Sequence, residues 1–119
     1  MNKDNLEKYL GGFNGSETSF PFGPEALVFK VMGKMFALVS QGDDIPRVTL
    51  KCDPVDGAHL VSQFDSVVPG YYMNKKHWIT ISLTGELPEE LLTDLARGSY
   101  ERVVKALTKK DREKLNPKE

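Results

Sequence analysis

The chain has 119 residues, 39% of them apolar, which predicts a single domain over residues 1–119 with a core of its own. Sixteen Lys and Arg oppose seventeen Asp and Glu, and this net charge of −1 argues against a protein held on DNA by overall charge. The charge is uneven, because residues 1–69 carry six cations and nine acids whereas residues 70–119 carry ten cations and eight acids. A local basic patch is compatible with this distribution.

The compartment is indicated by cysteine usage and by the absence of long apolar runs. A single cysteine, Cys52, excludes an internal disulfide and suits a reducing environment. The charged N-terminal stretch is unlike a signal peptide, and no apolar run approaches the ~20 residues that a membrane-spanning helix needs. We therefore expect a cytoplasmic protein without a membrane span.

The first part of the chain predicts a short helix and a hairpin. Residues 3–10 have helical apolar spacing, and Gly11-Gly12 is a stop signal. Gly33-Lys34 lies between two apolar runs and predicts a II′-type turn that would pair Phe29 with Leu38. This register directs one set of side chains to the core: Leu27, Phe29, Val31, Phe36 and Leu38. It directs another set to the opposite face: Val28, Lys30, Met32, Met35, Ala37 and Val39.

The remaining elements follow in order. Residues 47–51 alternate as a strand with Val48 and Leu50 inward, and Asp53-Pro54 is a helix start. We expect that helix to run to about residue 64, a strand over 78–83, a long helix from Pro88 that Gly98-Ser99 kinks or breaks, and a last short helix capped by Thr108. The order α-β-β-β-α-β(-β)-α predicts an α+β fold, an antiparallel sheet with helices on one face.

Period-two alternation gives the helix-free face of this sheet an unusual composition. If Ile79 and Ile81 point into the core, Trp78 and Thr80 point away from it. That face would carry Lys30, Arg47, Thr49, Lys51, Trp78, Thr80 and Ser82, beside Met32 and Met35. Cations and hydroxyls around one tryptophan are typical of a binding surface. Alternatively, Trp78 folds over the sheet edge as part of the core.

The segment 71–78, YYMNKKHW, is the densest in side chains that stack, hydrogen-bond and carry charge. Lys75 and Lys76 could grip phosphates, Asn74 and His77 could contact a base edge, and the aromatic rings could stack on exposed bases. The alternative is a loop with two solvated lysines above packed aromatic rings.

Catalytic and metal signals are weak. Cys52 and His77 could form a nucleophile and base, but one cysteine and two histidines at unrelated spacings do not indicate such a pair. Asp53, Asp56 and His59 are close in sequence, although Asp53 is better explained as a helix cap and no ligand cluster has metal spacing. No phosphate-binding glycine motif is present. We expect no enzyme activity, no metal and no cofactor.

Three motifs resemble the MmcQ/YjbR family of small bacterial proteins: residues 20–38 (FPFGPEALVFKVMGKMFAL), 48–54 (VTLKCDP) and 72–78 (YMNKKHW). SYERVV at 99–104, in the long helix that Pro88 starts, extends the resemblance to nearly the whole chain. It implies an α-β3-α-β2-α fold similar to secretion chaperones, and a DNA-binding role, because the arrangement resembles a double-wing motif. The positions that match the family's polar signature are Asn74, Lys75, His77 and Trp78, and Lys76 falls where the family tends to be basic.

Two functional hypotheses follow. The first is a non-enzymatic DNA-binding protein that uses Asn74, Lys75, Lys76, His77 and Trp78, together with Lys30, Arg47 and Lys51. The alternative is a protein-interaction or homodimerising module in which a partner covers the outer sheet face at Val28, Met32, Met35 and Val39.

Overall fold

The computed structural model describes residues 1–70 and 76–116, which form four helices and a six-stranded sheet. The helices are α1 (Lys3–Gly11), α2 (Pro54–Gln63), α3 (Glu89–Ala106) and α4 (Lys109–Leu115). The strands are β1 (Ser16–Ser19), β2 (Ala26–Val31), β3 (Lys34–Ser40), β4 (Arg47–Lys51), β5 (Val67–Pro69) and β6 (Trp78–Ser82). The strand order is β1-β2-β3-β4-β6-β5, and every neighbouring pair is antiparallel.

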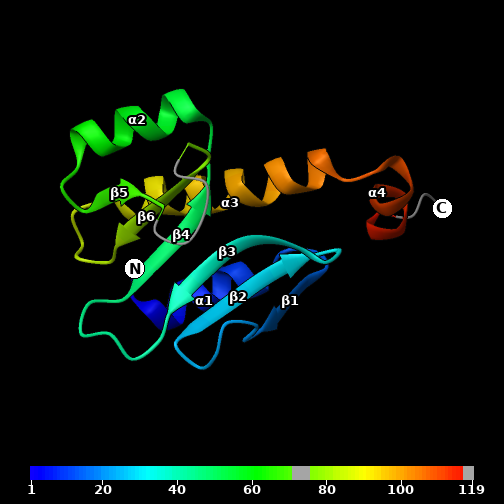
Figure 1. Ribbon diagram of the computed structural model, residues 1–119, viewed down its shortest axis with the longest axis horizontal. Coiled ribbons are helices and arrows are strands. Elements are labelled where there is room, and N and C mark those ends of the chain that lie inside the picture. The colour runs from blue at the N-terminus through cyan, green and yellow to red at the C-terminus, as the bar shows by residue number, and fades with distance from the viewer. Residues whose placement is uncertain (71–75, 117–119) are drawn as a thin grey trace.

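One face of the sheet carries the main core. Figure 1 shows α1 and α3 behind the strands, and α2 beside β5 and β6. Each helix contributes buried apolar side chains to this core: Leu6, Leu10, Leu60, Leu92, Ala96, Val103 and Leu115. The predicted α+β fold with helices on one face is confirmed. Strand β1 was not predicted, because its sequence SETS has no apolar alternation and pairs only as an edge. Among the described residues no helix is long and apolar enough to span a bilayer.

The predicted helix boundaries are confirmed by their caps. Gly12 ends α1, the Asp53 carboxylate accepts the N–H of Val55 at the start of α2, and the Thr108 hydroxyl accepts the N–H of Asp111 in α4. The predicted kink at Gly98-Ser99 is wrong, because α3 runs unbroken through both residues. Packing against the sheet outweighs the low helix propensity of this pair.

Ser99 instead joins two strands. Its hydroxyl donates to the carbonyl of Phe36 in β3 at 2.5 Å and accepts the N–H of Lys51 in β4 at 2.9 Å. Direct pairing of β3 with β4 ends at Ala37 and Leu50. The fully buried Ser99 therefore supplies hydrogen bonds to two backbone groups just beyond the last strand pair, where β3 and β4 no longer pair with each other.

The β2–β3 turn differs from the prediction by one residue. Its central residues are Met32 and Gly33, with φ of 49° and 77°, so both have the positive φ of a I′-type turn rather than the predicted II′ turn at Gly33-Lys34. A I′ turn matches the twist of the flanking strands, and this preference outweighs the strain of a left-handed methionine. This turn pairs Val31 with Lys34 and Lys30 with Met35, and one extra residue of β3 beyond that point pairs Phe29 with Ala37 rather than with Leu38.

One extra residue in β3, rather than the position of the turn, changes the faces of that strand. A register irregularity opposite Phe29 and Lys30 leaves Phe36 as an extra residue, and Phe36 packs in the main core beside Ala37. Phe29 is in the main core as predicted. Leu38, predicted for that core, lies in a second buried cluster with Ala26 and Val28. Ala37 and Val39, predicted for the other face, belong to the main core.

Candidate functional site

The face of the sheet opposite the main core, here called the open face, has two chemically different halves. The polar half, over β4 and β6, consists of Arg47, Thr49, Lys51, Trp78, Thr80 and Ser82. The apolar half, over β2 and β3, consists of Ala26, Val28, Met35 and Leu38. Ile79 and Ile81 are in the main core, so the predicted outward direction of Trp78, Thr80 and Ser82 is confirmed.

A threonine pair forms the centre of the polar half. Thr49 and Thr80 are direct cross-strand partners, and their hydroxyl oxygens are 2.9 Å apart. They are only 2% and 3% exposed. The pair stabilises the β4–β6 contact rather than offering hydroxyls to a ligand.

Lys51 and Trp78 lie next to this pair and are also cross-strand partners. The Lys51 Nζ is 6.0 Å from the Trp78 ring centroid, at the outer limit of a cation–π contact, and both residues are half-buried. The N–H of Gly70 donates to the Trp78 carbonyl at 2.8 Å, and a Cβ at position 70 would be 2.7 Å from the Trp78 Cβ. Trp78 is therefore fixed beside Lys51 on the open face and does not fold into the main core.

Lys76 and His77 immediately precede β6, and both side chains are exposed. The structure thus brings four predicted residues, Lys51, Lys76, His77 and Trp78, to one end of the polar half. Asn74 and Lys75 of the predicted site lie outside the described residues.

The other two predicted cations lie elsewhere. Arg47 is at the opposite end of β4 from Lys51, about 13 Å along the strand, and pairs with Asp43 at 3.2 Å. Lys30 is on β2, where its cross-strand partner in β1 is Glu17. The alternation of residues along the predicted strands could not reveal these acidic neighbours. Asp43 lies in a loop, and Glu17 lies in β1, the edge strand that was not predicted.

The Cys52–His77 pair considered for catalysis has contact only through the backbone. The Cys52 N–H donates to the His77 carbonyl at 2.9 Å. The Cys52 side chain is 7% exposed and lies against Gly57, where an added Cβ would be 2.8 Å from its sulfur. Burial raises the pKa of the Cys52 thiol, more than the positive charge of Arg102 lowers it. A thiol in this setting favours the neutral form, which is a poor nucleophile.

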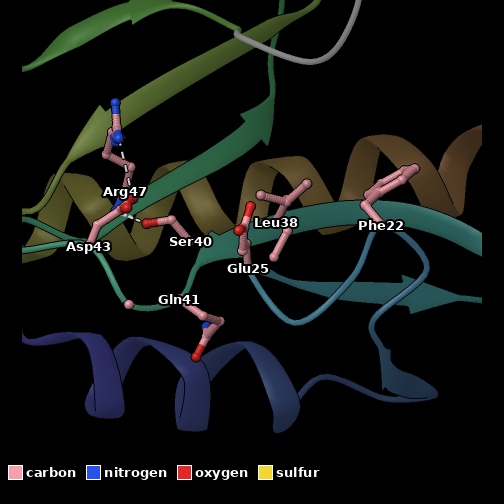
Figure 2. Close-up of a pocket in the computed structure, with 9 residues that line it drawn as sticks. Phe22, Glu25, Leu38, Ser40, Gln41, Asp43 and Arg47 are labelled. Atoms are coloured by element: carbon pink, nitrogen blue, oxygen red, sulfur yellow. Dashed lines mark hydrogen bonds and ion pairs between the residues drawn. The ribbon is translucent and has the colours of Figure 1, made fainter.

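A hollow beside the apolar half was not predicted from the sequence. It is open to solvent, has a volume of about 720 Å³, and lies between the segment before β2 and the loop between β3 and β4. Ala26, Leu38 and Ser40 line it from the strands, Phe22 and Glu25 from one side, and Asp43 and Arg47 from the other. Figure 2 shows Phe22, Glu25 and Leu38 projecting away from α1. The signal in the sequence was Phe22, an aromatic residue between Pro21 and Gly23-Pro24, which are turn formers rather than core formers.

The apolar half does not present the surface that the partner hypothesis required. Val28 is fully buried, Val39 is in the main core, and Met32 packs against that core from the turn. Met35 packs against the buried cluster of Ala26, Val28 and Leu38. The expectation of four large apolar residues on one exposed face was wrong, because it depended on the shifted β2–β3 register.

Fold and site together define an α+β domain with an open sheet face that is partly basic. The family model YjbR matches residues 11–102, and the chain belongs to the YjbR family. It is 43% identical over 101 residues to YbdF of Escherichia coli O157:H7, covering 85% of this chain and 83% of that protein. It is 32% identical over 115 residues to YjbR of Escherichia coli K12, covering 97% and 98%. Both relatives are described as uncharacterized proteins, so these names carry no activity.

Solved structures share the fold. A Deinococcus radiodurans protein, DR2400, with a DUF419 domain, matches with a TM-score of 0.87 and 42% identity over 94% of this chain and 86% of its own. A Pseudomonas syringae protein matches with a TM-score of 0.75 and 26% identity over 86% of this chain and 98% of its own. The resemblance predicted from the three motifs is confirmed.

Proposed function

We propose that the chain is a non-enzymatic, cytoplasmic DNA-binding protein that holds a DNA strand against one end of the polar half. The observation that carries this proposal is the placement of Lys51 beside Trp78 on adjacent strands, with exposed Lys76 and His77 leading directly into the same strand end. A basic groove with an aromatic ring on which a base can stack is the usual arrangement for single-stranded nucleic acid.

Each side chain has a distinct role in this proposal. The Trp78 ring stacks on one base, and the ammonium groups of Lys51 and Lys76 neutralise phosphates on either side of it. His77 donates a hydrogen bond to a phosphate or to a base edge. Asn74 and Lys75, which precede Lys76 directly in the sequence, belong to the same predicted set but lie outside the described residues.

Binding should be weak and strongly dependent on salt. The net charge is −1, so attraction comes from a local cluster rather than from the whole protein. Engagement of about three or four phosphates would give a slope of log K against log salt of about −2 to −3 for a single strand. Little dependence on base sequence is expected, because phosphate contacts and stacking are tolerant of sequence.

The test measures fluorescence anisotropy of labelled single-stranded and duplex oligonucleotides from about 50 to 200 mM salt. Lys51→Gln and Lys76→Gln should each flatten the slope by about 0.7 for the single strand and about 0.9 for the duplex. The matched control is Lys34→Gln, which removes an exposed lysine at the β2–β3 turn and should leave the slope unchanged. Trp78→Leu, which keeps an apolar side chain but removes the ring, should weaken single-strand binding by about 1–3 kcal/mol.

Two results would overturn the proposal. One is the absence of any anisotropy change with either oligonucleotide at about 50 mM salt, where phosphate contacts are strongest. The other is an equal effect of Lys34→Gln and Lys51→Gln, which would assign any binding to diffuse charge rather than to the polar half.

A further inference from the structure

We propose that the hollow beside the apolar half is a binding site for a small organic cation, an ammonium group joined to an apolar, ring-bearing body. The volume of about 720 Å³ lies within the range of small-molecule sites, roughly 300–1,000 Å³. This site is separate from the Lys51–Trp78 cluster, and its test does not depend on DNA binding.

The hollow has an apolar floor. Ala26 of β2 and Leu38 of β3 form this floor and are 9% and 2% exposed. Both belong to the second buried cluster. Figure 2 shows Leu38 directed to the same side as Phe22 and Glu25. A ligand body that rests on these side chains loses contact with water without displacing any polar group of the protein.

Phe22 supplies a wall that is both aromatic and exposed. Its side chain is 66% exposed, although an aromatic ring of this size is usually buried. The surrounding backbone is held by two successive turns, in which Gly23 N–H donates to the Phe20 carbonyl and Ala26 N–H donates to the Gly23 carbonyl. The positive φ of Gly23, 100°, permits this tight path. The ring is therefore presented at the hollow at little entropic cost, and its face attracts cations.

The charges at the hollow favour a cationic ligand. Asp43 and Arg47 pair with each other at 3.2 Å and largely cancel. Glu25, the remaining ionisable lining residue, is exposed and has no ion-pair partner within the described part of the chain. A carboxylate beside an exposed aromatic ring and an apolar floor matches an ammonium group carried on an apolar body.

The rim around the hollow is fixed by hydrogen bonds. The Gln41 N–H donates to the Glu25 carbonyl at 2.8 Å, which ties the two walls together. The Gln41 side chain points the other way, toward α1, and donates to the Glu7 carboxylate at 2.7 Å. The Arg47 N–H donates to the Ser40 hydroxyl at 2.8 Å. These bonds indicate a pocket that is formed before a ligand arrives, which is the usual state of small-molecule sites.

The experiment titrates the full chain with three matched probes: 2-phenylethylammonium, neutral 2-phenylethanol and anionic 3-phenylpropanoate. The readout is the NMR methyl signals of Ala26 and Leu38, which report on the floor of the hollow. We expect saturable shifts with the ammonium probe, and binding about fivefold or more tighter than that of the anion. Raising the salt concentration should reduce this preference, because Glu25 is exposed.

Two pairs of variants locate the binding. Glu25→Gln and Phe22→Ala should each weaken binding of the ammonium probe about threefold or more. Their matched controls, Glu17→Gln and Phe20→Ala, remove an exposed acid of β1 and an exposed phenylalanine that does not line the hollow, and should leave binding unchanged. All four side chains are exposed, so the thermal midpoint should stay near that of the parent chain.

The proposal is overturned if no saturable shift of the Ala26 and Leu38 methyl signals occurs up to about 10 mM probe, which corresponds to negligible affinity. It is also overturned if 3-phenylpropanoate binds as well as 2-phenylethylammonium, or if Glu25→Gln weakens binding no more than Glu17→Gln.

Discussion

The two halves of the open face share one backbone sheet and differ in how their side chains are buried. In the polar half, burial at the centre is achieved by pairing two hydroxyls, Thr49 with Thr80, while charged and aromatic side chains flank them. In the apolar half, Val28 and Leu38 are cross-strand partners and are buried without any polar atom. One sheet can therefore offer a nucleic-acid surface and an apolar-floored hollow side by side, because the residue types at the outward positions change at the β3–β4 boundary.

The two sites depend on this boundary in different ways. Lys51 and Trp78 are at the end of β4 and β6 where direct pairing of β3 with β4 has stopped. The hollow lies at the opposite end, where Arg47 begins β4 and Ser40 ends β3. The sheet thus separates a basic end, at Lys51, from an end where the carboxylate of Glu25 lines the hollow.

The largest expected effect on stability comes from removing the Ser99 hydroxyl, which links β3 to β4 at the boundary between the two halves. Ser99→Ala should lower the free energy of unfolding by about 2–3 kcal/mol, because the Phe36 carbonyl and the Lys51 N–H both lose the buried hydroxyl that satisfies them. Urea denaturation measures this change. Ser62→Ala is the control, since Ser62 is an exposed helix residue whose hydroxyl bonds to the His59 carbonyl. Equal small effects of the two variants would mean that Ser99 does not join the two halves.

A smaller loss of stability should follow from placing a hydroxyl group in the apolar half. Val28→Thr keeps the side-chain shape but places a hydroxyl at a fully buried position whose cross-strand neighbour is Leu38. We expect a loss of about 1–2 kcal/mol in the free energy of unfolding, again measured with urea. The control is Thr18→Val on β1, an exposed edge position. If Val28→Thr is as well tolerated as the control, water or a polar partner reaches the apolar half, and the contrast between the halves is wrong.

The difference between the halves also explains which parts of the structure the sequence could predict. Strand β4 and, apart from Trp78, strand β6 alternate between apolar and polar residues, so period two alone assigns Val48, Leu50, Ile79 and Ile81 to the core. Strands β2 and β3 are apolar on both faces, and a slip of one residue in their register leaves the hydrophobic pattern equally good. The turn at Met32-Gly33 and the extra residue Phe36 in β3 together decide the register, and neither can be predicted from residue preferences alone.

The candidate sites follow the same division. The Lys51–Trp78 neighbourhood was predictable, because it needs only alternation within two well-patterned strands. The hollow was not, since it depends on two loops separated by fifteen or more residues that meet through the Gln41–Glu25 backbone hydrogen bond. The pairing of Arg47 with Asp43 was likewise invisible in the alternation pattern, because Asp43 belongs to a loop.

The smallest expected effect concerns the edge of the sheet at β5. There the Glu86 carboxylate accepts a hydrogen bond from Ser66, which directly precedes this strand. The contact with Ser66 lowers the pKa of the Glu86 carboxyl, and the Ser66 backbone N–H donates to the Glu86 Oε1 at 2.8 Å. A carboxyl group with a lowered pKa in the folded state stabilises the fold above its unfolded pKa, and this contribution is lost as the pH falls through the folded pKa. Stability should therefore decline, partly through Glu86, as the pH falls below the ordinary pKa of a glutamate.

Replacing the Glu86 carboxylate tests whether the β5 edge of the polar half, unlike its centre, is held by a hydrogen bond that depends on pH. Glu86→Gln should make the urea midpoint less dependent on pH over this acidic range, while the matched variant Glu101→Gln, at an exposed position of α3, leaves the dependence as it is. Because Glu86 is solvent-exposed, the difference should be small and should shrink as salt is added. The polar half would then be held at its centre by the pH-independent Thr49–Thr80 pair and at its β5 edge by a titratable bond. An unchanged acid dependence in Glu86→Gln would mean that this hydrogen bond does not stabilise the fold, and that β5 is held by its pairing with β6 and by the burial of Val67.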